Sequence, residues 1–192
     1  MPNVEYMADG DRVKTKNAAI ASDDYVKDQY YFKRMGVSEG WPSAGVVLTA
    51  DDEFVVAELR NNPFTDHVHW TFPRPEHWRK GTFKITVWIA ADTAEVAKDI
   101  RAHFHLSAYK LGSATGDVEN LSGADDQTVR LPSAADILQE VTVTSSTPVA
   151  FGEDFPILSF EFQRVASHAF DNYGGHIHLF GVTIEYRPSQ SQ

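Results

Sequence analysis

Apolar and polar residues alternate at every second position along several segments of this chain, as they do in strands that bury one face. Residues 82–89 place four large apolar side chains on one face, namely Phe83, Ile85, Val87 and Ile89. Residues 100–108 alternate in the same way, with Phe104 on the apolar face and His103 and His105 on the other. Each segment predicts a half-buried antiparallel strand.

Shorter strand-like segments occur along the rest of the chain: residues 46–49, 54–59, 64–72, 141–149, 158–162 and 176–186. Turn-forming stretches rich in Gly, Ser, Asp and Asn, such as residues 112–124, lie between them. Residues 134–139 are the best candidate for a short helix. Many short strands separated by turns predict an all-β fold, an antiparallel β-sandwich.

Three of the four tryptophans lie in residues 67–90: Trp70, Trp78 and Trp88. Pro73 and Pro75 predict a rigid connection over residues 72–78, because proline lacks an amide hydrogen and has a fixed φ. We expect Trp70 and Trp88 to serve packing, so that replacing either with alanine costs roughly 3–5 kcal/mol if it is buried.

A family resemblance rests on three segments. The step W-x-x-G-T at Trp78–Thr82, which follows an aromatic residue and a proline, leads into the strand FKITVWIA. The segments SFEFQRV (residues 159–165) and LFGVTIEY (residues 179–186) follow later in the chain. Together they resemble the jelly-roll domain of virion proteins in tailed phages and related gene-transfer particles, over roughly residues 64–187. The resemblance implies a non-enzymatic structural subunit (a capsid decoration, head-spike or fibre protein) that forms a homo-oligomer, a trimer in particular, and contacts the major capsid or other virion proteins.

The chain divides into three expected parts. Residues 1–50 form an N-terminal arm, residues 51–188 the jelly roll, and residues 189–192 a polar tail. The arm is rich in aromatic residues that favour interfaces: Tyr25, Tyr30, Tyr31, Phe32 and Trp41. Two interpretations stay open, an extension laid over the sandwich and an arm that docks onto another subunit.

Composition excludes several classes of function. A net charge of −10 and a pI near 5.1 argue against nucleic-acid binding, which needs clustered Lys and Arg. The chain has no cysteine, which rules out disulfides, thiolate nucleophiles and Cys-based zinc sites. The N-terminus lacks the basic and apolar regions of a signal peptide, and no apolar run approaches the ~20 residues of a membrane span. We therefore expect no membrane contact and synthesis in a cytoplasm, and the resemblance to phage proteins implies a host cytoplasm and a place in the virion.

Six of the eight histidines form three H-x-H pairs: His67/His69, His103/His105 and His176/His178. Residues i and i+2 of a strand share a face, so each pair offers two imidazoles to one metal ion. The first two pairs lie opposite the apolar positions. The third shares the parity of Val182 unless Gly181 introduces a bulge. The pairs fit two interpretations, packing at a subunit interface and a metal site, and H-x-H also resembles the motif of cupin-like metal enzymes.

No motif of a nucleophile, phosphate loop or calcium loop is present, so we expect no catalysis and no cofactor. A carbohydrate-binding module is the alternative function, with Trp41, Trp78 or loop tyrosines stacked on sugar rings and host-surface glycans as ligands. If the histidine pairs lie at an oligomer interface, the assembly should weaken as the pH falls through about 6.5, the ordinary histidine pKa.

Overall fold

The computed structural model describes residues 4–6, 13–15, 31–51, 54–61, 66–74, 80–109, 126–144, 149–150 and 155–188. The strands are β1 (Val4–Tyr6), β2 (Val13–Thr15), β3 (Tyr31–Gly36), β4 (Trp41–Pro42), β5 (Val47–Asp51), β6 (Phe54–Leu59), β7 (Asp66–Pro73), β8 (Lys80–Ala91), β9 (Asp99–Tyr109), β10 (Asp126–Arg130), β11 (Gln139–Thr144), β12 (Val149–Ala150), β13 (Ile157–Arg164) and β14 (Ile177–Pro188). Among these residues the helical structure is one short 3-10 turn, η1 (Val37–Glu39).

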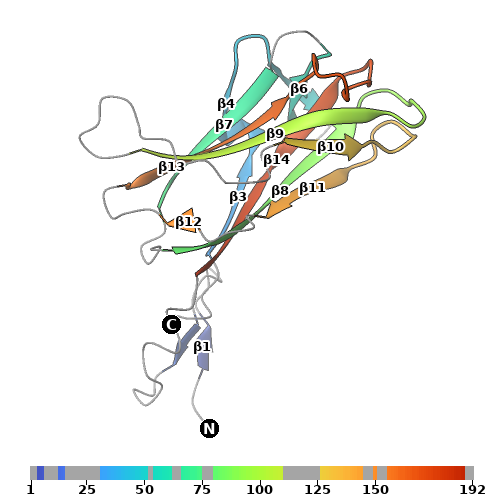
Figure 1. The fold of residues 1–192 in the computed structure, drawn as a ribbon. Helices are drawn as coiled ribbons and strands as arrows, with labels where there is room; N and C mark the ends of the chain where they lie inside the picture. The colour runs from blue at the N-terminus through green and yellow to red at the C-terminus, as the bar shows by residue number, and fades with distance from the viewer. Residues whose placement is uncertain are drawn as a thin grey trace.

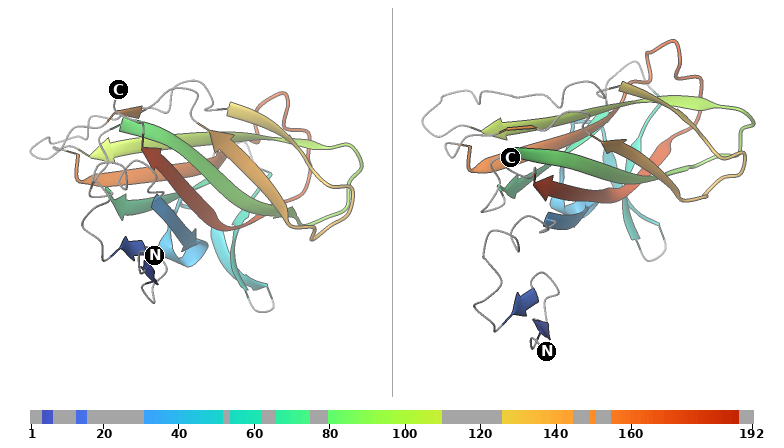
Figure 2. Two further views of the ribbon diagram at one scale, coloured as in Figure 1. Left: turned by 90° about the horizontal axis from the view of Figure 1, so that it is seen from below. Right: turned by 60° about the horizontal axis from the view of Figure 1, so that its bottom comes forward.

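The strands form two antiparallel sheets that pack as a sandwich (Figures 1 and 2). The five-stranded sheet has the order β10-β9-β13-β7-β4. The seven-stranded sheet has the order β11-β8-β14-β6-β5, with β12 also paired to β8 and β3 to β14. Strands β1 and β2 pair with each other. The predicted all-β sandwich is confirmed.

The core lies between the two sheets and is filled by the apolar positions of the alternating strands. In β9 the burial alternates strictly from Asp99 to Ala108, and Phe104 and Leu106 are fully buried. The aromatic members of the core are Trp70, Phe72, Phe83, Phe104, Phe160, Phe162, Tyr173 and Tyr186. Because the inward positions are filled in this way, the histidines of β7 and β9 lie on the outer face of the five-stranded sheet, together with Glu161 and Gln163 of β13.

A β-bulge interrupts β14 between Leu179 and Gly181. Before it, Ile177 and Leu179 are buried, and after it the buried positions become Val182 and Ile184. A side chain at Gly181 would place its Cβ 2.5 Å from the carbonyl oxygen of Met35, so only glycine fits there. The bulge keeps both halves of β14 facing the core, and it places His178 with the outward residues.

Two expectations differ from the structure. Residues 134–138 form a bend, a turn and irregular backbone rather than a helix, with Asp136 at a positive φ of 56°, and β11 begins at Gln139. Residues 31–50, which belong to the expected arm, include β3 and most of β5 in the seven-stranded sheet and β4 in the other. The sandwich therefore begins before the expected boundary at residue 51. Among the described residues no helix has the length and apolar character to cross a bilayer.

Candidate functional site

A row of four residues crosses the outer face of the five-stranded sheet. Trp41 of β4 pairs with His69 of β7, His69 pairs with Glu161 of β13, and Glu161 pairs with His105 of β9. Residues paired in register point to the same face of a sheet, with Cβ atoms about 4.5–5.5 Å apart. Residues that are distant in sequence therefore become neighbours on one surface.

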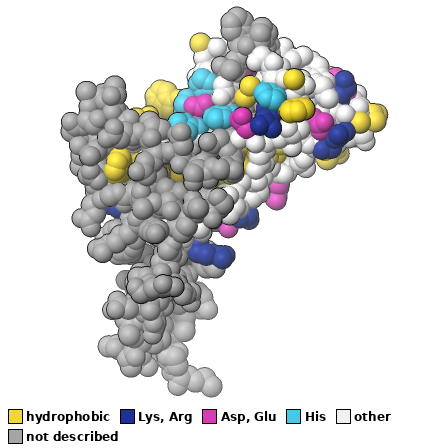
Figure 3. Space-filling model, viewed as in Figure 1, with side chains coloured by type: hydrophobic (Ala, Val, Ile, Leu, Met, Phe, Trp, Pro, Cys, Tyr) yellow, Lys and Arg dark blue, Asp and Glu magenta, His cyan; other side chains and the backbone are white. Residues whose placement is uncertain are grey.

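A second row runs beside the first. His67 of β7 pairs with Gln163 of β13, Gln163 pairs with His103 of β9, and His103 pairs with Asp126 of β10. Figure 3 shows histidine side chains gathered with acidic ones on this face. Two of the three predicted histidine pairs thus share one surface, although they come from strands far apart in the chain.

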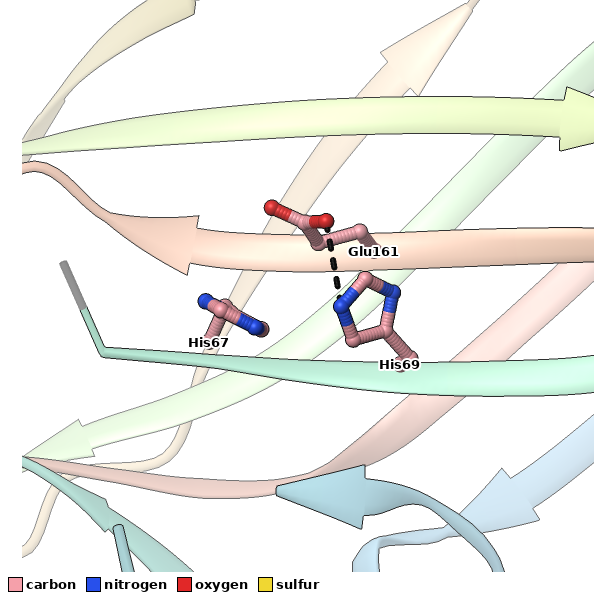
Figure 4. Close-up of side chains that lie close together, drawn as sticks. All are labelled: His67, His69 and Glu161. Carbon is pink, nitrogen blue, oxygen red and sulfur yellow. Dashed lines mark ion pairs between the residues drawn. The ribbon is translucent and has the colours of Figure 1, made fainter. Parts of the chain in front are cut away.

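The His67 and His69 rings contact each other edge to face, with their centroids 4.7 Å apart. His69 Nε2 lies 3.3 Å from Glu161 Oε2, and Figure 4 shows the three side chains facing one another. Burial lowers the pKa of His69, and the nearby His67 and His105 lower it further, although Glu161 acts in the opposite direction. The lowered pKa favours the neutral form of the His69 imidazole.

The far end of this face is held by charged groups on β9 and β10. His103 Nδ1 lies 2.8 Å from Asp126 Oδ1, and Arg101 contacts the other carboxylate oxygen at 3.4 Å. Arg101 also donates to the Thr128 hydroxyl at 3.0 Å. The hydrogen bond with His103 lowers the pKa of Asp126 most, so this carboxyl stays ionised on the face.

Large exposed side chains with apolar surface lie at the borders of these two rows of polar residues. Trp41 is 71% exposed, and Tyr109 and Ile157 are each 46% exposed. Trp41 lies in the same row as His105, three strand spacings or about 14 Å from it across the sheet. Tyr109 lies about 13 Å from His105 along β9. Because these two directions are perpendicular, Trp41 and Tyr109 are roughly 19 Å apart. The face has two aromatic side chains with hydrogen-bonding groups between them.

The third histidine pair lies elsewhere. His178 belongs to β14 of the seven-stranded sheet, and His176 precedes that strand. His176 Nδ1 lies 2.6 Å from Glu58 and 3.9 Å from Asp92. The enclosed histidine site of a cupin-like enzyme is not formed by the described residues, because the space between the sheets is packed with apolar side chains.

The aromatic residues assigned to the arm have separate positions. Tyr25 and Tyr30 lie outside the described residues, and Tyr31 and Phe32 are the first two residues of β3. Trp41 lies on the outer face beside His69. Of the tryptophans expected to pack, Trp70 is fully buried, whereas Trp88 is half-buried on the outer side of β8, where its Nε1 lies 3.4 Å from Glu140.

Sequence reasoning missed the partners of the histidines on this face, Glu161, Gln163 and Asp126. Each lies on a strand adjacent to a histidine strand, and strand order cannot be derived from residue alternation. The alternation of β13 did indicate that Glu161 and Gln163 point away from the core, because they interleave with Phe160 and Phe162.

Comparison with protein-family models and with curated proteins found no match. Among solved structures, the isomalto-dextranase of Arthrobacter globiformis T6 complexed with panose is similar over 80% of this chain, with 11% identity and a TM-score of 0.55. This chain spans 23% of that enzyme's chain. The CBM36-1 domain of a multidomain xylanase from the hindgut metagenome of Trinervitermes trinervoides has 11% identity and a TM-score of 0.47, and the match covers 84% of this chain and 100% of that domain. The enzymatically active domain of tailspike protein 4 from bacteriophage CBA120 has 12% identity and a TM-score of 0.36, with 81% of this chain and 19% of that chain covered.

These likenesses concern the fold alone. At such low identity they carry no information about ligand or activity. The class that the structure defines is an antiparallel β-sandwich of two packed sheets. The sandwich part of the resemblance stated from the sequence is confirmed, and the part that names virion proteins stays a prediction.

Proposed function

We propose that this chain is a non-enzymatic carbohydrate-binding domain that binds neutral oligosaccharides on the outer face of its five-stranded sheet. The observation that carries the proposal is Trp41, whose indole is 71% exposed and lies in register with the polar row of His69, Glu161 and His105. A large exposed aromatic beside convergent hydrogen-bonding groups is a typical recognition surface.

The arrangement matches the chemistry of a sugar. A pyranose ring has an apolar face of C–H groups and a rim of hydroxyls, so it binds to a flat aromatic ring with polar groups at its edge. Trp41 provides the flat ring, and Glu161 and Gln163 provide acceptors and donors for hydroxyls. Because about 19 Å separates Trp41 from Tyr109, the face suits an oligosaccharide rather than one sugar.

Charge favours a neutral ligand. The carboxylates of Glu161 and Asp126 lie on this face, and the chain as a whole carries a net charge of −10. An acidic polysaccharide would be repelled by this field. Neutral hydroxyl groups, in contrast, donate hydrogen bonds to carboxylates, and such charge-assisted bonds are stronger than neutral ones.

Because the sequence contains no motif of a catalytic nucleophile, we propose that the face binds sugars without cleaving them.

The test is a screen of neutral oligosaccharides of xylose, glucose and galactose on a glycan array, followed by calorimetric titration of the ligands found. Trp41→Ala should weaken binding at least about tenfold, because a central aromatic anchor contributes upward of about 1.4 kcal/mol. The control is Phe54→Ala, which removes another exposed aromatic, 63% exposed, from the seven-stranded sheet. Equal binding by wild type and Trp41→Ala would contradict the proposal.

The role of a virion structural protein stays a prediction that rests on the sequence resemblance. It is compatible with sugar binding, because a subunit on a particle surface can bind host glycans through the same face. If the protein is a decoration, head-spike or fibre subunit, it should co-purify with particles from an infected or induced host. Its absence from such particles would contradict the virion role and leave the binding proposal intact.

A further inference from the structure

His67, His69 and Glu161 form a compact group of metal-ligating atoms on the outer face (Figure 4). The two imidazoles come from β7 and the carboxylate from β13, and one ligand atom from each residue lies within 4.8 Å of the others. We propose that these three residues bind a divalent transition-metal ion, for which Zn²⁺ is the representative probe. The inference goes beyond sugar binding and does not depend on it.

The distances suit tetrahedral coordination. With bonds of about 2.0 Å, two ligand atoms of a tetrahedral zinc site are about 3.3 Å apart. His69 Nε2 and Glu161 Oε2 are already 3.3 Å apart, so these two residues can share an ion without moving. The remaining imidazole needs a small side-chain rotation to close the third distance, which lies within the 4.8 Å limit of the group.

The ligand types suit a transition metal better than calcium or magnesium. Imidazole nitrogen prefers Zn²⁺, Cu²⁺, Ni²⁺ and Fe²⁺, whereas Ca²⁺ and Mg²⁺ prefer sites made of oxygen ligands. Two histidines and one carboxylate leave further coordination positions open to water or to another ligand. The carboxylate offsets one of the two charges of the ion.

The sheet holds the ligands in place. Strands β7 and β13 pair over eight residues, from Asp66 with Arg164 to Pro73 with Ile157. Beneath the ligands, Val68 and Phe162 are fully buried and fix both strands against the core. Metal binding therefore requires little ordering of the chain, which favours affinity.

The second histidine pair on this face supplies a matched control. The His103 and His105 rings are 6.2 Å apart, against 4.7 Å for His67 and His69. His103 Nδ1 is occupied by Asp126 at 2.8 Å. His103→Ala removes one imidazole from the same exposed sheet and leaves the proposed ligands intact.

The experiment is a calorimetric titration of Zn²⁺ into the EDTA-treated, dialysed full-length protein, with Co²⁺ absorption spectra as a report on coordination geometry. We expect one tightly bound ion per chain, with a dissociation constant below about 100 µM. His69→Ala and Glu161→Gln should each weaken binding at least about tenfold, and His103→Ala should change it less than about threefold. Circular dichroism checks that each variant is folded.

Absence of zinc binding, unchanged binding in His69→Ala and Glu161→Gln, or an equal loss in His103→Ala would each overturn the site. Because zinc is titrated without sugar, this result is independent of the oligosaccharide screen. Trp41 pairs with His69 and has no metal-ligating atom, so Trp41→Ala should retain zinc binding even if it loses sugar binding.

Discussion

Trp70→Ala removes the largest of the fully buried side chains and should destabilise the sandwich strongly. The indole stacks on Phe160, with centroids 5.9 Å apart and planes 19° apart. Its Nε1–H donates to the carbonyl oxygen of Gly36 at 2.9 Å, which joins β7 to the end of β3 in the other sheet. Removing a buried tryptophan costs about 3–5 kcal/mol, since a cavity remains and packing contacts are lost.

Trp70→Phe separates the contribution of aromatic packing from that of the hydrogen bond to Gly36. It keeps an aromatic ring in the core and removes the donor to Gly36, so the expected cost is about 1–3 kcal/mol. Urea unfolding followed by circular dichroism measures both losses as shifts of the midpoint at constant slope. In thermal unfolding, Trp70→Ala should lower Tm by roughly 6–20 °C, because a chain of this size loses about 2–4 °C per kcal/mol.

The control for this series is Trp41→Ala, whose indole is exposed and which should change stability by less than about 0.5 kcal/mol. A loss below about 1 kcal/mol for Trp70→Ala would refute the assignment of Trp70 to the centre of the core. An unfolding midpoint for Trp41→Ala equal to that of wild type also ensures that any loss of sugar binding reflects the face and not the fold.

Three further predictions concern buried charge and assembly. Asp171→Ala should cost about 3–5 kcal/mol in urea unfolding, because it leaves the fully buried Arg164 without its ion-pair partner at 2.8 Å. Burial opposes the ionisation of Asp66, but hydrogen bonds from Arg60 outweigh burial and lower the pKa of Asp66 in the folded protein. The ion pair with Arg60 should therefore stabilise the fold fully above about pH 4, the pKa of Asp in the unfolded chain. This stabilisation should be lost as the pH falls through the lower pKa of Asp66 in the folded protein. The stability difference between wild type and Asp66→Asn should therefore shrink in acid, and a constant difference would contradict the assignment. The homotrimer implied by the virion resemblance should appear in light scattering at about pH 8 and weaken at about pH 5, and a monomer at both values would contradict it.

The alternation of apolar and polar residues predicted the strands of the sandwich that carry the outer-face histidines, because one face of each strand is buried and the other is not. In β9, Phe104 and Leu106 define the inner face without any knowledge of the neighbouring strands. The sequence also indicated a β-bulge at Gly181 as the alternative to an inward-facing His178, since glycine tolerates the backbone conformation of a bulge. The helix expected over residues 134–139 fails because so short a helix has little propagation to offset its nucleation, and Gln139 pairs with Ile89 in the sheet instead.

The candidate site could be predicted only in part. The pair His67 and His69 is evident from its spacing, but Glu161 joins it through the pairing of β13 with β7, which depends on sheet order. The sequence makes Trp41 a candidate both for a subunit interface and for stacking on sugar rings. Its place at the edge of the five-stranded sheet, beside His69, depends on the pairing of the short strand β4 with β7, which the sequence does not reveal.

A nuclear magnetic resonance titration of the ¹⁵N-labelled protein with an oligosaccharide selected in the screen tests sugar recognition most directly, because it locates the ligand. Sugar binding on the outer face predicts that the Trp41 indole signal shifts most, together with amides of β7, β13 and β9 around His69, Glu161 and His105. Shifts confined to the loop of residues 165–176 or to the seven-stranded sheet, with the Trp41 signal unchanged, would contradict it.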